Sequence, residues 1–144
     1  MKANPYKSWI EIDSSLPAEP ILVYGPPPTS GTRDAWVELV MEEGCGEFEA
    51  IKALDEDRHD EVCQRMRTDG AFVEAGENDN LIVQRLETDP TAFGIFGYSF
   101  LYENLDTLKP VTIGGVAPSA ETIGDFSYPV SRPLFFYVKN AHRG

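Results

Sequence analysis

The run Thr29-Ser30-Gly31-Thr32-Arg33 has the residue types and the order of an anion-binding turn at the start of a helix. The first N–H groups of a helix have no partner inside it, and the helix dipole favours negative charge at that end. Gly31 would let a ligand approach the backbone closely, while the hydroxyls of Ser30 and Thr32 would add donors. The alternative is that Thr29 or Ser30 is only an N-cap and that Gly31 serves a tight turn.

The two cysteines, Cys45 and Cys63, lie 18 positions apart, each at or near the end of an expected helix. No further cysteine or close histidine completes a metal-ligand spacing, so we expect a disulfide and therefore an oxidising compartment. Two free, buried thiols in a cytosolic protein are the alternative. His59 and His142 are expected at the surface.

The composition limits the classes of function. A chain of 144 residues with 42% apolar residues predicts one globular domain, and its net charge of −12 argues against nucleic acid as a partner. A small anion remains compatible, since a few N–H groups and one arginine make a local site. No stretch approaches the roughly 20 apolar residues of a membrane span, and the start lacks the apolar region of a signal peptide. We expect a soluble chain.

The elements that would position these residues follow from the apolar pattern. Short apolar runs alternate with stretches of helical periodicity, and Gly44 and Gly46 end the first helix. The expected strands are 21–24, 71–73 and 92–96, and the expected helical stretches are 30–43, 48–66 and 81–86. Within the second stretch, the acidic residues 55–57 suit a helix N-terminus. This order predicts an α/β fold with a parallel sheet and helices on both faces, with ligands beyond the carboxyl ends of the strands.

The two ends of the chain are less regular. Residues 9–12, in the proline-containing first twenty, are expected to pack on the domain or to form a helical turn. Near the other end we expect a strand at 111–113, a short helix at 119–123 and a strand at 134–138. The last run is almost wholly apolar, which predicts burial in this sheet or against something that the chain lacks.

Three segments together resemble the phosphate-binding proteins of ABC phosphate transporters. They are residues 23–36, 95–98 and 118–123, and the similarity extends from about Pro5 to Lys139. The resemblance implies a three-layer α/β sandwich with a mainly parallel sheet, which is one lobe of a type 2 periplasmic binding protein. It implies the second lobe only, in a fragment whose Met1 was added, with phosphate clamped and dehydrated between this lobe and a missing first lobe.

The resemblance also implies ligands. Ser30, Gly31 and Thr32 match the family's Ser-Gly-Thr, but Pro26 and Pro28 stand where the family commonly has an arginine and an aspartate. The positive charge must then come from elsewhere. Arg33 is the nearest candidate, and Arg132 is a distant one.

A second group of candidate ligands is Glu77-Asn78-Asp79, in the turn after the second strand. Asn78 would donate to phosphate while a carboxylate accepts the proton of HPO₄²⁻. The alternative is that Asn78 or Asp79 caps the following helix. Tyr98 and Tyr102 are expected to pack rather than to bind.

The expected function is that of a periplasmic or otherwise extracytoplasmic solute-binding component of an ABC transporter. It would bind inorganic phosphate or a related oxyanion without cofactor or turnover, and deliver it to the membrane permease. The expected parts are an N-terminal arm (1–20), the ligand-binding lobe (21–128) and a hinge return with a strand (129–144) towards the missing lobe. The alternatives are a phosphatase-like enzyme using Ser30 or Thr32 and a ligand-free structural or signalling domain. With its apolar last strand, the fragment is also a candidate homodimer.

Overall fold

A three-stranded parallel sheet forms the centre of the protein. The computed structural model describes residues 4–142, and its strands are β1 (Val23–Gly25), β2 (Phe72–Glu74) and β3 (Phe93–Gly94). Their order in the sheet is β2-β1-β3, and β1 runs parallel to both neighbours. The predicted α/β class, the parallel sheet and its three strands are therefore confirmed.

Strand β1 is the central strand because its residues can be covered from both sides. Tyr24 is buried, and the guanidinium of Arg85 lies 5.9 Å from the centre of its ring. Gly25 ends the strand where space is short, since a Cβ there would lie 2.6 Å from the ring of Phe72 on β2. Pro26 follows and cannot donate to a ladder, so the strand stops.

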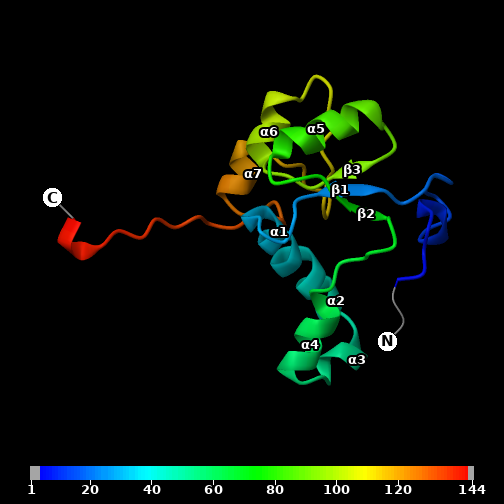
Figure 1. Cartoon of the computed structure of the whole chain (residues 1–144), viewed down its shortest axis with the longest axis horizontal. Helices are drawn as coiled ribbons and strands as arrows, with labels where there is room; N and C mark the ends of the chain where they lie inside the picture. Colours follow the sequence, from blue (N-terminus) through cyan, green and yellow to red (C-terminus); the bar gives the residue numbers. More distant parts are fainter. Residues whose placement is uncertain (1–3, 143–144) are drawn as a thin grey trace.

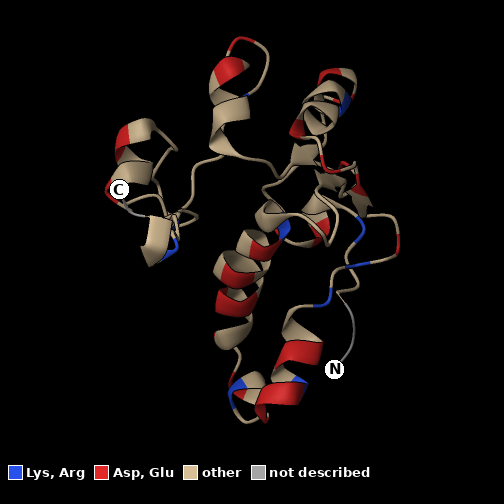
Figure 2. Cartoon of the chain, turned by 60° about the vertical axis from the view of Figure 1, so that its left-hand side comes forward, with Lys and Arg blue, Asp and Glu red and all other residues tan. Residues whose placement is uncertain are grey.

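One long helical run follows this loop and supports its start. It consists of α1 (Gly31–Trp36), a π-helical stretch η2 (Val37–Glu42) and α2 (Glu43–Gly46), and the backbone stays helical at each junction. Its end at Gly46 confirms the predicted end. In Figures 1 and 2, α1 lies below the strands, whereas α5 (Asp79–Thr88) lies above them and α6 (Tyr98–Glu103) follows β3.

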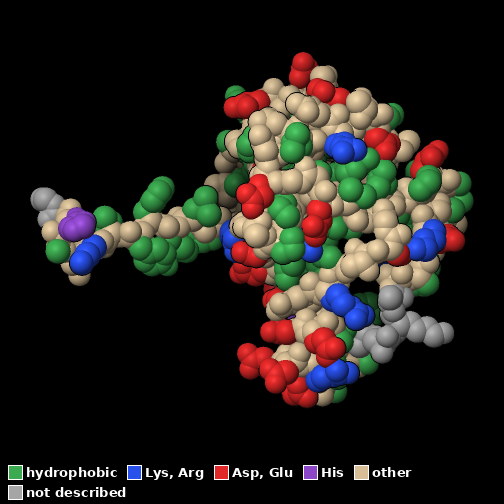
Figure 3. All heavy atoms as spheres, viewed as in Figure 1, with side chains coloured by type: hydrophobic (Ala, Val, Ile, Leu, Met, Phe, Trp, Pro, Cys, Tyr) green, Lys and Arg blue, Asp and Glu red, His purple; other side chains and the backbone are tan. Residues whose placement is uncertain are grey.

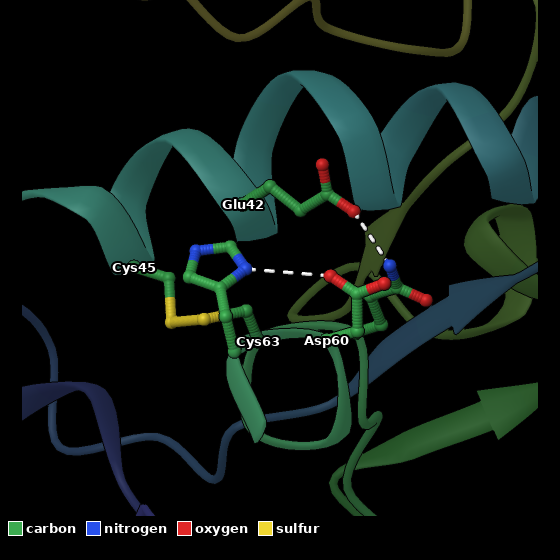
Figure 4. The surroundings of a disulfide bond; sticks show 6 residues. Glu42, Cys45, Asp60 and Cys63 are labelled. Carbon is green, nitrogen blue, oxygen red and sulfur yellow. Dashed lines mark hydrogen bonds and ion pairs between the residues drawn. A yellow bond between two sulfur atoms is a disulfide. The ribbon is translucent and has the colours of Figure 1, made fainter. Parts of the chain in front are cut away.

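A helical extension below the sheet contains the disulfide. Its helices are α3 (Glu49–Lys52) and α4 (Glu56–Cys63), and Figure 2 shows that many of its residues are acidic. Cys45 and Cys63 are bonded with a Cα–Cα distance of 5.7 Å, which confirms the predicted disulfide. It joins the end of the long helical run to the end of α4 (Figure 4).

The N-terminal arm packs against the sheet. Its one helical turn is η1 (Trp9–Glu11), and the Trp9 ring lies 4.8 Å from the ring of Phe93 on β3. Lys7 also forms an ion pair with Asp69, just before β2. Both predicted behaviours of residues 9–12, packing and a helical turn, are thus observed.

The C-terminal part departs most from the predicted pattern. Helix α7 (Ala120–Gly124) is present, but residues 111–113 form no strand and contribute only a bridge between Ile113 and Val116. Residues 134–138 do not form the predicted buried strand either, because no described segment pairs with them. They extend away from the body towards η3 (Asn140–His142), and Phe136 is 99% exposed (Figures 1 and 3).

Candidate functional site

At the start of α1, Ser30 forms the N-cap that the capping alternative expects, and its role as an anion ligand stays a prediction. Ser30 is the N-cap, with an extended backbone, and its Oγ accepts a hydrogen bond of 3.2 Å from the N–H of Thr32. The hydroxyl hydrogen of Ser30 therefore remains available to donate. Thr32 Oγ1 makes no hydrogen bond to any residue in the range 4–142. Beside Gly31, no atom lies within 4 Å of the place that a Cβ would occupy, so a ligand can approach the backbone there.

A second helix begins next to this one. Gly97 is the N-cap of α6, and it follows β3 at the same carboxyl edge of the sheet. The carboxylate of Asp79, which is buried, accepts a hydrogen bond of 3.0 Å from the Gly97 N–H and so fixes this turn. Two helix N-termini therefore lie at the carboxyl edge of the sheet, the edge at which such sheets bind ligands.

The two helix starts line a common hollow of about 460 Å³, which we call the α1 hollow. An arginine from far along the chain lies in its wall. Arg132 Nη2 donates to the carbonyl of Gly31 at 3.2 Å, and Nη1 lies 2.7 Å from Glu38 Oε2. The polar part of the lining comprises Ser30, Gly31, Thr32, Gly97, Tyr98 and Arg132.

Arg33 lies elsewhere, although it is next to the Ser-Gly-Thr run. Its Nη1 donates to the carbonyl of Pro26 at 3.1 Å, and its guanidinium lies 4.9 Å from the centre of the Phe72 ring. With 11% of its side chain exposed, it stabilises the proline loop against β2 and does not line the α1 hollow. A role for Arg33 in binding an anion stays a prediction.

The turn after β2 also lies outside the α1 hollow. Asn78 is the N-cap of α5, and its Oδ1 accepts a hydrogen bond of 3.0 Å from the N–H of Asn80. This is the capping alternative considered for Asn78. Glu77 accepts a hydrogen bond from the hydroxyl of Thr29, which ties this turn to the loop before α1. An anion contact by Asn78 stays a prediction.

Sequence reasoning assigned no ligand to the turn after β3, although residues 95–98 carry part of the family resemblance. The run Phe96-Gly97-Tyr98 has the same signal as the turn after β1, namely an apolar strand followed by a glycine and a helix. Tyr98 was expected only to pack. It does lie 6.2 Å from Tyr102, ring centre to ring centre, but it also lines the α1 hollow.

The α1 hollow offers hydrogen-bond donors and one guanidinium to a ligand. The hydrogen-bond partner of Ser30 Oγ is a backbone N–H, which cannot take a proton from the hydroxyl as a general base would. His59 lies beside Asp60 on α4, with Nδ1 3.4 Å from the carboxylate. Among residues 4–142, no cluster of three or more His, Cys, Asp or Glu side chains could hold a metal ion.

The sequence of this chain is similar to a known domain family and to individual proteins with related names. The profile of the PBP superfamily domain matches residues 3–144. The phosphate-binding protein PstS of Staphylococcus haemolyticus is 35% identical over 92% of this chain, and the protein SphX of Synechococcus elongatus is 29% identical over 91%. The chain spans 36% and 34% of these two relatives, which is about a third of their length.

The comparison of structures gives a similar result. The crystal structure of a possible phosphate binding protein from Planctomyces limnophilus superposes with a TM-score of 0.61 at 27% identity. The match covers 86% of this chain and 38% of the other.

Within residues 4–142, none of the helices combines the length and the apolar character that crossing a membrane requires.

Proposed function

This chain belongs to the PBP superfamily, and from that premise we propose that it is the anion-binding lobe of a solute-binding protein of an ABC transporter. The proposed ligand is inorganic phosphate or a related tetrahedral oxyanion. The relatives from Staphylococcus carry phosphate binding in their names, which favours phosphate.

One observation carries this proposal: the start of α1 and Arg132 face the same hollow. Ser30 and Thr32 each have a hydroxyl hydrogen to donate, Gly31 adds its N–H, and Arg132 adds positive charge. Phosphate oxygens accept such hydrogen bonds, and each is worth roughly 1.5–3 kcal/mol when the acceptor is charged. A neutral sugar would leave this charge without an anion, and an apolar ligand would leave the donors unmatched as well.

We propose binding without turnover. A serine nucleophile needs a base within hydrogen-bond reach, and the partner of Ser30 Oγ is the N–H of Thr32. The hydroxyl is held as an N-cap, which orients it for donation to a ligand. This favours transport over the phosphatase alternative.

The wider setting of the site is part of the same proposal. We propose that a first lobe closes over the α1 hollow and supplies the remaining ligands, and that a membrane permease receives the anion. A periplasmic or otherwise extracytoplasmic location suits the Cys45–Cys63 disulfide, which requires an oxidising compartment.

An NMR titration of the ¹⁵N-labelled chain with phosphate, and separately with sulfate, tests the site. We expect the amide signals of Gly31 and Thr32 to shift with phosphate, with a Kd on the order of millimolar, because a single lobe leaves part of the anion in water. Replacing Ser30 by alanine should abolish the shifts.

Ser119→Ala is the matched control. Ser119 is also an N-cap, for α7, and its Oγ accepts a hydrogen bond of 3.1 Å from Thr122, but it does not line the α1 hollow. Both variants lose a cap worth about 1 kcal/mol, so a difference between them reports binding. Equal loss of the shifts in both variants, or shifts spread evenly over the chain, would contradict the proposed site.

A further inference from the structure

The turn after β2 touches the loops that follow the other two strands. Thr29, in the loop after β1, donates its hydroxyl hydrogen to the carboxylate of Glu77. Gly97, in the turn after β3, donates its N–H to the carboxylate of Asp79 at 3.0 Å. One short segment therefore joins the carboxyl ends of all three strands, although β1 lies between β2 and β3 in the sheet. We call residues 77–79 the brace turn.

The brace turn reaches two parts of the α1 hollow without lining it. Ser30, directly after Thr29, lines the hollow at the start of α1, and Gly97 lines it at the start of α6. Neither Glu77 nor Asp79 is among the lining residues. The two carboxylates therefore act on a ligand in the hollow through the position of its lining or through their charge, and not through contact.

The two contacts of the brace turn differ in strength. Among residues 4–142, Asp79 is the only charged side chain that is buried, with 8% exposed, so its hydrogen bond is shielded from water. It also lies in the first turn of α5, where the helix dipole stabilises a negative charge. Glu77 and Thr29 are both exposed, and water competes for their groups. We therefore expect most of the effect to come from Asp79.

Asp79 holds the chain at the point where it leaves the sheet. The N–H of Ile95 still donates to the carbonyl of Tyr24 on β1, at 2.9 Å. Two residues later, the N–H of Gly97 turns to Asp79 instead. Gly97 is the N-cap of α6, and its carbonyl accepts a hydrogen bond of 3.1 Å from the N–H of Phe100. The place of Gly97 thus determines where α6 begins.

We propose that Asp79 is a positioning residue for the anion site. Its carboxylate holds Gly97 and so keeps the α6 side of the α1 hollow in the place that a bound oxyanion requires. Glu77 acts in the same way on the loop before Ser30, with a smaller effect. This inference rests on the proposed phosphate site, and it gives the brace turn a role in binding that needs no contact with the anion.

Two substitutions separate the hydrogen bond of Asp79 from its charge. Asp79→Asn removes the charge and keeps an oxygen that accepts from Gly97, whereas Asp79→Ala removes both. In the amide titration with phosphate at constant ionic strength, we expect Asp79→Ala to weaken binding roughly 10-fold, the effect of losing an outer-shell partner at a metal site. Asp79→Asn should stay within about 2-fold of the parent, because a neutral acceptor still holds the turn.

Asp69→Ala is the matched control. The carboxylate of Asp69 also accepts a backbone N–H, that of Ala71 at 3.3 Å, but it precedes β2 at the amino end of the strand. It does not line the α1 hollow. The substitution removes the same charge and should lower the stability of the chain while leaving the phosphate Kd unchanged.

Gly97 allows the same test from the side of the donor. Its φ of −66° and ψ of 144° suit proline, and a Cβ there would lie at an ordinary contact distance of 3.5 Å from Asp79 Oδ2. Gly97→Pro removes the N–H and should weaken binding about as much as Asp79→Ala, whereas Gly97→Ala keeps the N–H. Adding Asp79→Ala should then cost less than about 2-fold in the proline variant and roughly 10-fold in the alanine variant.

Hydrogen exchange without ligand keeps this inference separate from the proposed function. In the phosphate-free chain, the Gly97 N–H should exchange about 10-fold faster or more in Asp79→Ala than in the parent, and Asp79→Asn should stay near the parent. Circular dichroism checks that the variants fold. A parent without phosphate shifts refutes the phosphate site and with it the effect on binding, while the exchange at Gly97 still shows whether Asp79 holds the turn.

Three results would overturn the positioning role in a chain that binds phosphate. The first is an Asp79→Ala variant with the affinity of the parent. The second is an Asp79→Asn variant as weak as Asp79→Ala, which would assign the effect to charge. The third is exchange at Gly97 that no Asp79 substitution changes.

Discussion

Replacing Arg132 by alanine tests where the positive charge of the site comes from. Its guanidinium donates to the carbonyl of Gly31 at 3.2 Å and pairs with Glu38 at 2.7 Å, so it is held beside the start of α1. A charged donor in such a position strengthens the binding of an oxyanion. Its contribution is larger when the donor is shielded from water and smaller when another group already pairs with it.

The structure limits how large this contribution is. A hydrogen bond to a charged group is worth about 1.5–3 kcal/mol, but 34% of the Arg132 side chain is exposed and Glu38 competes for it. We therefore expect Arg132→Ala to cost about 1–1.4 kcal/mol, which weakens phosphate binding roughly 5- to 10-fold. Glu38→Gln removes the competing carboxylate, so it should act in the opposite direction and tighten binding about 2-fold, on the order of 0.5 kcal/mol.

The assay is the amide titration of Gly31 and Thr32 with phosphate. Arg33→Ala is the matched control, because it removes the same charge from a side chain that contacts Pro26 and Phe72 instead. We expect it to lower the melting temperature and to leave the phosphate Kd nearly unchanged. Unchanged affinity in Arg132→Ala, or weaker binding in Glu38→Gln, would refute the assignment of the charge.

Three further predictions concern stability. Reduction of Cys45–Cys63 should destabilise the chain by about 3 kcal/mol on the chain-entropy model for a loop of 18 residues, as measured by urea unfolding with and without reductant. Hydrogen bonds from Arg67 and from a lysine of the N-terminal arm hold the pKa of Asp69 well below its ordinary 3.8. Its stabilising effect is therefore present above about pH 4 and lost as the pH falls further, so the stability difference between the parent and Asp69→Asn should shrink below that pH. Gly94→Ala should cost about 1–3 kcal/mol in thermal unfolding, because its Cβ would lie 2.6 Å from a side-chain atom of α5.

The central sheet could be predicted from the sequence because its signals are local. Each strand is a short apolar run with a turn residue after it, and each helix shows its own periodicity. The order of the elements then leaves a parallel sheet as the expected arrangement. The start of α1 was predicted for the same reason, since Ser30 and Gly31 define an N-cap and a close approach within two positions.

Arg33 and Arg132 are both candidates for the positive charge in the sequence analysis, and the sequence alone could not decide between them. Arg33 is near Ser30 in sequence, but a helix rotates successive side chains by about 100°, and the direction of Arg33 depends on Phe72 from another strand. Arg132 reaches α1 from 101 positions away from Gly31, through a segment without regular structure. The predicted strands at 111–113 and 134–138 failed for a related reason, because a strand needs a partner and their sequences do not say which segment supplies one.

The prolines before α1 connect these observations. Pro26 has no N–H and a fixed φ, so the loop has one free backbone group at this position, its carbonyl, and Arg33 donates to it. The nearest cation thus holds the loop, and the guanidinium that lies beside the start of α1 is that of Arg132.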